Sequence, residues 1–266
     1  MKMPLTSLTS GMGIEVLPDL YFFPIQIVNI CFIGKANQQE FVLVDAGMPD
    51  CHEMIFEEAE NRFGPGAKPS AIILTHGHFD HIGALEELLN KWDVPVYAHQ
   101  AEEPFLTGQE NYPPPNTGAE GLVSKLSPLF PRNSINISKN LQILPQDGSI
   151  PVLPDWKVIH TPGHTPGHIS LYREHDEVLI AGDAFVTVEQ ESLYEVLTQK
   201  QEMHGPPAYF TMDWQAASKS VKKLAALKPK TAITGHGLPM TGNNLMEGLT
   251  TLAANFDETE IPENRK

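Results

Sequence analysis

Apolar, strand-like runs that end in glycine beside a histidine or an aspartate recur along this chain. This pattern restricts the fold more than any other feature. The clearest examples are "AIILTHG" at 71–77, "LIAGDAF" at 179–185 and "AITGHGLP" at 232–239. Nearly continuous apolar runs are typical of strands that are covered on both faces of a sheet. Open α/β sheets carry their functional groups at the carboxyl ends of such strands. We therefore predict an α/β fold whose functional residues follow the strands.

Eight strands and four helices are predicted from patterns of this kind. The strands occupy 27–34, 40–47, 70–77, 94–99, 156–161, 168–174, 177–183 and 230–236. The helices occupy 51–63, 82–92 and 213–229, with a last one that begins at Asn243. Polar connections at 35–39 and 173–177 join neighbouring strands and predict two hairpins. The elements form two strand-and-helix halves, one before residue 100 and one after residue 140.

The length of 266 residues suits one large domain or two small ones, and we interpret the chain as a single domain over 1–266. Two irregular stretches, at about 100–140 and 186–212, contain the segments "YPPPNTG" and "HGPPAYF". Irregular stretches of this length usually have a function or act as linkers. We expect both to be loops that cover one face of the domain.

Composition argues against several classes of partner. The chain carries 33 acidic and 18 basic residues, a formal net charge of −15, and so acidic a surface repels nucleic acids. Cys31 and Cys51 lie in or beside apolar runs and are expected to be buried, reduced thiols. The N-terminus does not resemble a secretory signal, and the run at 21–34 is too short to span a membrane. We expect a cytoplasmic protein that acts on a small molecule. The oligomeric state stays open.

The segment "THGHFDHIG" at 75–83 places three of the 11 histidines and an aspartate within six positions. It lies at a predicted strand-to-helix turn. Strand alternation points His76 and His78 in one direction, and the turn points Asp80 and His81 in a second one. Imidazole and carboxylate ligands together suit zinc, and also iron or manganese. One metal ion needs about four ligands, so two ions require more donors than this segment holds.

Three further donors follow predicted strands. His164 lies in the loop "HTPGHTPGH", Asp183 follows "LIAG" and His236 follows "AITG". Glycine stands beside each of them, and glycine allows the backbone to turn sharply close to an ion. The three positions complete a set that is sufficient for two metal ions.

These residues resemble the metallo-β-lactamase superfamily of metal-dependent hydrolases. The matching motifs are "VDAG" at 44–47, "HGHFDH" at 76–81, "GHT" at 163–165, "GD" at 182–183 and "GHG" at 235–237. They occur in the order of the family and cover the chain from about 27 to 240. The resemblance implies a four-layer αββα sandwich built from two similar halves.

The resemblance also implies the role of each donor. His76, His78 and His164 would hold one metal ion, most often Zn²⁺. Asp80, His81 and His236 would hold the second ion, and Asp183 would bridge both. Two such ions lower the pKa of a shared water to about neutrality, so that the resulting hydroxide can attack an ester, lactone, thioester or phosphoester. Asp80 would pass a proton to the leaving group.

Six further residues complete the predicted site. Asp45 resembles the family's aspartate that orients a ligand histidine, and His168 is expected to support the ligands from behind. Four aromatic residues in or near the irregular stretches are predicted to contact the substrate: Tyr112, Phe185, Tyr209 and Phe210. For these four, simple burial as loop anchors is the competing interpretation.

Other branches of the family fit less well. β-Lactamases of this fold lack the bridging aspartate, and glyoxalase II carries a longer C-terminal extension. Quorum-quenching lactonases match "GHTPGH" and "DA" but often have a tyrosine where Val186 stands. Persulfide dioxygenases share the histidine motif and use a single iron, so an oxidoreductase stays an alternative. A non-catalytic member is a further one.

Overall fold

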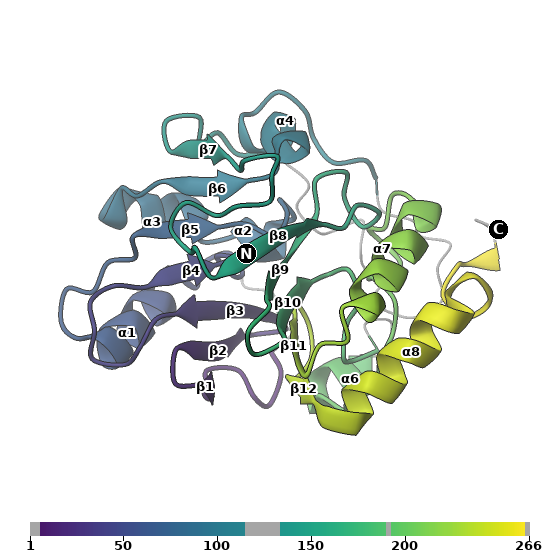
Figure 1. Ribbon diagram of the computed structural model, residues 1–266. Helices are drawn as coiled ribbons and strands as arrows, with labels where there is room; N and C mark the ends of the chain where they lie inside the picture. The colour runs from purple at the N-terminus through teal and green to yellow at the C-terminus, as the bar shows by residue number, and fades with distance from the viewer. Residues whose placement is uncertain (1–5, 115–133, 190–192, 264–266) are drawn as a thin grey trace. The chain divides into compact units, whose positions relative to one another are not determined.

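In the computed structural model of this protein, residues 6–114, 134–189 and 193–263 are described. The chain divides into two compact units. Unit 1 comprises Met1–Tyr112, Arg132–Leu144 and Pro151–Leu153. Unit 2 comprises Pro113–Pro131, Pro145–Ile150 and Pro154–Lys266. Each unit contains one mixed sheet with its own helices (Figure 1). The assignment of 1–266 to a single domain stays a prediction.

The sheet of unit 1 has seven strands in sequence order. They are β1 (Ile14–Leu17), β2 (Leu20–Ile25), β3 (Val28–Ile33), β4 (Val42–Val44), β5 (Ala71–Ile73), β6 (Val96–Ala98) and β7 (Leu141–Ile143). Strands β1 to β4 pair antiparallel, and β4 to β7 pair parallel. The carboxyl ends of β4, β5 and β6 therefore lie at one edge of the sheet. The residues that follow these strands begin at that same edge.

Helices connect the parallel strands of unit 1. They are α1 (His52–Phe63), α2 (Phe79–Ile82), α3 (Leu85–Trp92), η1 (Gln100–Glu102) and α4 (Glu103–Leu106). Helix α1 buries Phe56 and Phe63, and Phe63 stacks on Phe41 with ring centroids 4.0 Å apart. Phe56 meets Trp92 of α3 edge-on at 5.0 Å. Full burial of such a side chain contributes about 1.5–3 kcal/mol, so this aromatic cluster anchors both helices.

The sheet of unit 2 has the order β12-β11-β10-β9-β8. Its strands are β8 (Trp156–His160), β9 (Ile169–Arg173), β10 (Val178–Gly182), β11 (Thr231–Thr234) and β12 (Met240–Thr241). Its helices are α6 (Leu193–Thr198), α7 (Trp214–Ala226) and α8 (Gly242–Thr259). Only the β10–β11 pair is parallel among these strands.

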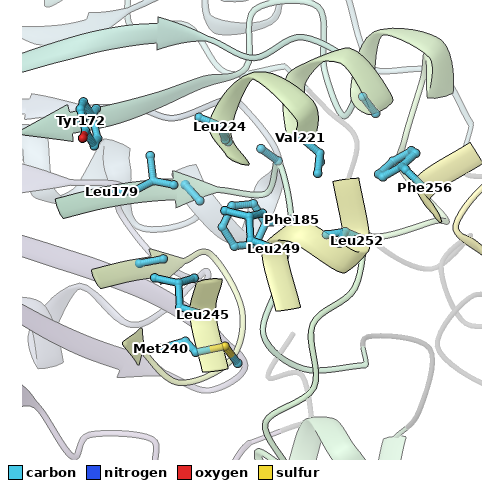
Figure 2. Packing of buried hydrophobic residues seen from close by; sticks show 14 of the residues in the cluster. Tyr172, Leu179, Phe185, Val221, Leu224, Met240, Leu245, Leu249, Leu252 and Phe256 are labelled. Carbon is cyan, nitrogen blue, oxygen red and sulfur yellow. The ribbon is translucent and has the colours of Figure 1, made fainter. Parts of the chain in front are cut away.

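Helices α7 and α8 pack on the sheet of unit 2 through one hydrophobic cluster (Figure 2). Leu179 and Phe185 contribute from the sheet side, Val221 from α7, and Leu249 and Phe256 from α8. Helix α7 begins as predicted, because the Asp213 side chain accepts a hydrogen bond from the backbone N–H of Ala216. The apolar positions of both helices recur at helical spacing, which places them on a single buried face.

The predicted elements agree with the structure, with identifiable differences. All eight predicted strands form, and both predicted hairpins connect antiparallel pairs, β3–β4 and β9–β10. Strands β1, β2, β7 and β12 were not predicted. The helix expected at 82–92 forms as α3, which begins at Leu85, and a separate short helix, α2, covers Phe79–Ile82 before Gly83. Asp80 and His81 consequently lie within a helical turn.

The two stretches expected to be irregular contain helices where they are described. Helices η1 and α4 begin the stretch at 100–140, and α6 lies within 186–212. Residues 115–133 and 190–192 of these stretches lie outside the described residues. In the described part of the chain, no helix is both long and apolar enough to cross a bilayer. Both cysteines are buried free thiols, as predicted.

Candidate metal centre

Unit 1 contains four candidate ligands, two in the turn between β5 and α2 and two within α2 itself. His76, His78, Asp80 and His81 are all at least 95% buried. The rings of His76 and His78 lie 4.7 Å apart, and those of His76 and His81 lie 4.1 Å apart. A candidate ligand atom of His81 also lies within 4.8 Å of a carboxylate oxygen of Asp80. Strand β5 ends at Ile73, so the turn itself brings His76 and His78 together, and strand alternation does not.

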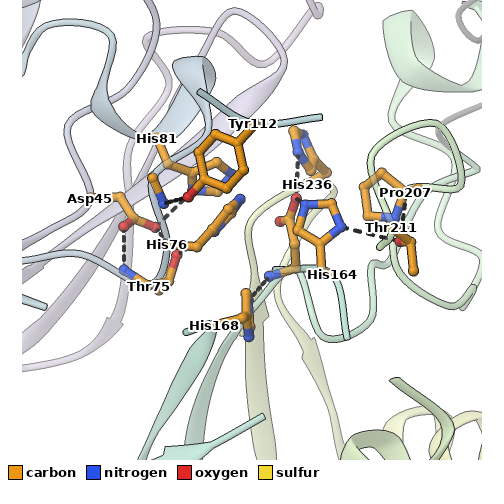
Figure 3. Close-up of polar contacts among 12 residues, drawn as sticks. Asp45, Thr75, His76, His81, Tyr112, His164, His168, Pro207, Thr211 and His236 are labelled. Carbon is orange, nitrogen blue, oxygen red and sulfur yellow. Dashed lines mark hydrogen bonds and ion pairs between the residues drawn. The ribbon is translucent and has the colours of Figure 1, made fainter. Parts of the chain in front are cut away.

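Asp45 holds this turn from the end of the neighbouring strand β4. Its carboxylate accepts hydrogen bonds from the backbone N–H and the hydroxyl of Thr75, both at 2.8 Å (Figure 3). It also accepts a hydrogen bond from His81 Nδ1 at 2.8 Å. Asp45 has a φ of +62°, a left-handed conformation that aspartate tolerates better than most residues. This backbone turn points the carboxylate toward the end of β5.

These contacts indicate which ring nitrogen of His76 and of His81 carries the proton. The Thr75 hydroxyl donates its only proton to Asp45, so it accepts the hydrogen bond of 3.1 Å from His76 Nδ1. His81 Nδ1 likewise donates to the carboxylate of Asp45. Both imidazoles therefore hold their proton on Nδ1, and Nε2 carries the lone pair that a metal ion requires.

Glu102 and Tyr112 bind the backbone of the same turn. Glu102 was not among the predicted site residues, whereas Tyr112 was predicted to contact the substrate. Glu102 of η1 is 1% exposed, and Tyr112 is 5% exposed. The Tyr112 hydroxyl donates a hydrogen bond to Glu102 Oε2, and both oxygens accept from the backbone N–H of Gly77. Burial, with the neighbouring carboxylate, raises the pKa of Tyr112 well above its ordinary value. Tyr112 is therefore a neutral hydrogen-bond donor near neutral pH.

Unit 2 contains three candidate ligands at one edge of its own sheet. Asp183 follows β10 and His236 follows β11, and these strands pair in parallel, Gly182 opposite Thr234. Strand β8 runs in the direction of β10 because two antiparallel pairings separate them. The loop after β8, which carries His164, therefore begins at the same edge.

Asp183 lies close to both candidate ligand histidines of unit 2, His164 and His236. Its Oδ2 atom is 3.4 Å from His164 Nε2 and 3.3 Å from His236 Nε2 (Figure 3). All three side chains are at least 98% buried. The loop that presents His164 needs glycine at 163, where φ is +140° and a Cβ would lie 2.4 Å from the backbone nitrogen of Ala217.

His164 has the same protonation pattern as His76. The Thr211 hydroxyl donates to the carbonyl of Pro207 at 2.8 Å, so it accepts the hydrogen bond of 3.2 Å from His164 Nδ1. The lone pair on His164 Nε2 then faces an oxygen of Asp183. Two acceptors this close repel each other unless a cation lies between them, either a proton on the ring or a metal ion. The donor set of unit 2 thus fits a divalent metal.

His168 also carries its proton on Nδ1, but its Nε2 accepts a hydrogen bond from the protein backbone. Its Nε2 accepts a hydrogen bond of 2.9 Å from the backbone N–H of Asp183, so its proton lies on Nδ1, which is 2.9 Å from the Thr161 hydroxyl. The side chain is completely buried. Because Nε2 accepts from the protein, His168 positions Asp183.

The aromatic residues predicted to contact substrate lie in different surroundings. Tyr112 contacts the turn that carries His76 and His78, and its ring centroid lies 4.5 Å from that of His78. Phe185 belongs to the hydrophobic cluster of unit 2 and is fully buried. Tyr209 and Phe210 meet edge-on at 4.9 Å and are also buried. Their contact with a substrate stays a prediction.

Comparison with known proteins agrees with this donor set. The family model of the metallo-β-lactamase superfamily matches residues 25–236. The chain belongs to this superfamily. It is 57% identical over 253 residues to the probable metallo-hydrolase YflN of Bacillus subtilis, which covers 94% of this chain and 96% of the relative. The α/β fold class of the metallo-β-lactamase type is thereby confirmed.

Two solved structures have the same fold. The B3 metallo-β-lactamase BLEG-1 aligns with a TM-score of 0.60 and 27% identity, covering 86% of this chain and 95% of that chain. TTHA1623, solved in a di-iron-bound form, aligns with a TM-score of 0.53 and 23% identity, covering 90% of this chain and 97% of that chain. At that identity, the second likeness supports the fold alone.

Proposed function

We propose that this protein is a metal-dependent hydrolase that uses two divalent metal ions to cleave a small-molecule ester, lactone, thioester or phosphoester. The observation that carries the proposal is the close approach of Asp183 Oδ2 to His164 Nε2 and His236 Nε2. Because His164 carries its proton on Nδ1, its Nε2 lone pair and the Asp183 oxygen can both bind a metal ion. The 57% identity to a probable metallo-hydrolase supports the same reaction type.

The family's order of ligands along the chain supports a specific assignment. His76, His78 and His164 would hold one ion, and Asp80, His81 and His236 the other, with Asp183 shared by both. When bound, the ions would polarise the scissile group and supply an activated water near neutral pH. Zn²⁺ is the proposed metal, with iron or manganese as alternatives.

The chain's own residues orient these ligands and manage protons. Thr75, Thr211 and Asp45 each bind the Nδ1 side of a ligand histidine, which fixes ring orientation before any substrate arrives. Asp80, buried in the first turn of α2, is the proposed donor of a proton to the leaving group. We further propose a cytoplasmic protein with no nucleic-acid or membrane partner, in keeping with its charge of −15.

Elemental analysis of the purified protein tests this proposal, followed by turnover of a panel of esters, lactones, thioesters, phosphoesters and β-lactams. We expect two metal ions per chain and hydrolysis that a chelator abolishes and added metal restores. Asp183→Ala should lose both metal and activity. His175→Ala, which changes an exposed loop histidine, should lose neither. One bound iron with oxygen consumption would instead favour the dioxygenase alternative, and a metal-free wild type would refute the proposal.

A further inference from the structure

His76, Gly77 and His78 form an H-x-H segment. Two buried side chains accept hydrogen bonds from the backbone N–H of Gly77 in this segment. The Gly77 nitrogen lies 3.0 Å from Glu102 Oε2 and 3.1 Å from the Tyr112 hydroxyl oxygen. The Tyr112 hydroxyl in turn donates to the same oxygen of Glu102. The three groups therefore form a closed hydrogen-bonded triangle. Hydrogen bonds to a carboxylate are stronger than those between neutral groups, so the triangle restrains the peptide between His76 and His78.

The topology of unit 1 brings Glu102 to this position. Strands β5 and β6 pair in parallel, Ile73 opposite Tyr97, so the chain leaves both strands at the same edge. The H-x-H segment follows β5, and η1 follows β6 with His99 as its N-cap. Glu102 is the last residue of η1, 25 positions beyond Gly77 in the chain.

The space around Gly77 shows independently that Tyr112 and Glu102 approach its backbone closely. A Cβ at position 77 would lie 2.7 Å from the Tyr112 hydroxyl and 3.3 Å from both Glu102 Oε2 and Leu106 Cδ2. The first distance is shorter than carbon and oxygen tolerate without a shift of the neighbour. Glycine between the two histidines is thus explained by the approach of Tyr112 and Glu102.

The Tyr112 ring also touches one of the candidate ligands. Its centroid lies 4.5 Å from that of the His78 imidazole, at an interplanar angle of 58°. Its other neighbour is Phe105 of α4, which stacks on it at 4.0 Å and 12°. Phe105 supports the tyrosine ring, and the tyrosine ring limits the rotation of His78.

We propose that Glu102 and Tyr112 are positioning residues that hold the H-x-H segment in its metal-binding conformation. Glu102 acts on the Gly77 peptide, and Tyr112 acts both on that peptide and on the His78 ring. The inference rests on the proposed function, because it assumes that His76 and His78 bind a metal ion. Partners of this kind, outside the ligands themselves, commonly change metal affinity by about 10- to 100-fold when they are removed.

Co²⁺ binding to metal-depleted protein tests the inference without any substrate. The affinity is measured by competition with a chromophoric chelator, and the visible absorption of bound Co²⁺ reports ligand geometry. Tyr112→Phe removes the hydroxyl but keeps the ring on His78, so we expect a loss of affinity of about 10-fold with a modest change of spectrum. Glu102→Ala should cost more, about 100-fold, and Glu102→Gln, which keeps an acceptor oxygen, should recover part of the loss.

Matched controls make the same changes nearby. Tyr97→Phe alters a tyrosine on β6, and Glu103→Gln alters the half-buried neighbour of Glu102. Both should leave Co²⁺ affinity and spectrum unchanged. Thermal unfolding of the metal-free variants separates folding from binding, and Tyr112→Phe remains informative if Glu102→Ala does not fold.

The outcomes separate the inference from the proposed function. Wild-type protein that binds no Co²⁺ contradicts the proposed function itself. Wild-type binding, together with unchanged affinity and spectrum in Tyr112→Phe and Glu102→Gln, leaves the proposed function standing and overturns the positioning role. Equal losses in Tyr97→Phe and Tyr112→Phe would overturn it as well, since the effect would then not depend on Gly77.

Discussion

Asp45 and His81 are joined by a hydrogen bond of 2.8 Å between Oδ2 and Nδ1, although they lie 36 positions apart in the chain. The same carboxylate accepts two hydrogen bonds from Thr75, and Thr75 accepts one from His76. One buried acid therefore sets the ring orientation of two candidate ligands. Removing its charge should act on metal binding more than on folding.

Asp45→Asn is the change that isolates this effect. Asparagine tolerates the φ of +62° at this position and keeps one acceptor oxygen for the backbone N–H of Thr75, so the protein should still fold. Because the amide nitrogen would replace the oxygen that accepts from His81 Nδ1 and from the Thr75 hydroxyl, we expect metal affinity to fall about 10- to 100-fold, measured by chelator competition. Asp50→Asn is a matched control, because Asp50 also has a positive φ, of 64°, but is exposed. Equal affinity in all three proteins would contradict the orienting role.

His168 should matter for the stability of unit 2 as well as for its ligands. In His168→Ala, the backbone N–H of Asp183 loses its acceptor in a fully buried place. A buried donor without an acceptor costs about 1–3 kcal/mol, which urea unfolding would detect. His168→Gln can offer an amide oxygen to the same N–H and should recover part of the loss. A His168→Ala protein as stable as wild type would show that water can replace His168 as the acceptor for the backbone N–H of Asp183.

The buried thiol of Cys51 makes stability fall at alkaline pH. Burial raises the pKa of Cys51 from 9.0 to about 12. Above pH 9, the unfolded chain releases the thiol proton while the folded chain keeps it, so the free energy of unfolding decreases as pH rises toward 12. The contribution of this group is on the order of 1 kcal/mol at pH 10. Urea unfolding at pH 8 and pH 10 measures the decrease, which should be smaller by about that amount in Cys51→Ala.

The parts of the site that follow apolar strands could be predicted from the sequence. Asp183 and His236 each follow a strand-like run that ends in glycine, and a parallel pair of strands brings such ends together. Asp45 follows the same rule at the end of β4. Strand β2 was less visible because it contains Pro24, and β7 is short and largely exposed.

Glu102 and Thr211, which support candidate ligands, could not be predicted in the same way. Glu102 is one of two adjacent glutamates in a polar segment, and nothing in the local sequence distinguishes it from Glu103. Its role arises only from the pairing of β5 with β6, which is a long-range property of the sheet. Thr211 is comparable, since its contact with His164 joins segments 47 positions apart.

A double-mutant cycle between Gly77 and Tyr112 tests their close approach in the folded protein. Gly77→Ala introduces a Cβ that would lie 2.7 Å from the Tyr112 hydroxyl, so we expect it to cost about 1–3 kcal/mol of unfolding free energy. Tyr112→Phe removes that hydroxyl and should cost about 1 kcal/mol by itself. Because the double variant lacks the colliding atom, its loss should be smaller than the sum of the two by about 0.5–3 kcal/mol. Urea unfolding of the four proteins measures this coupling, and Gly77→Ala combined with Tyr97→Phe, which should be additive, is the control. Additive losses in the Tyr112 cycle would show that the two groups do not collide.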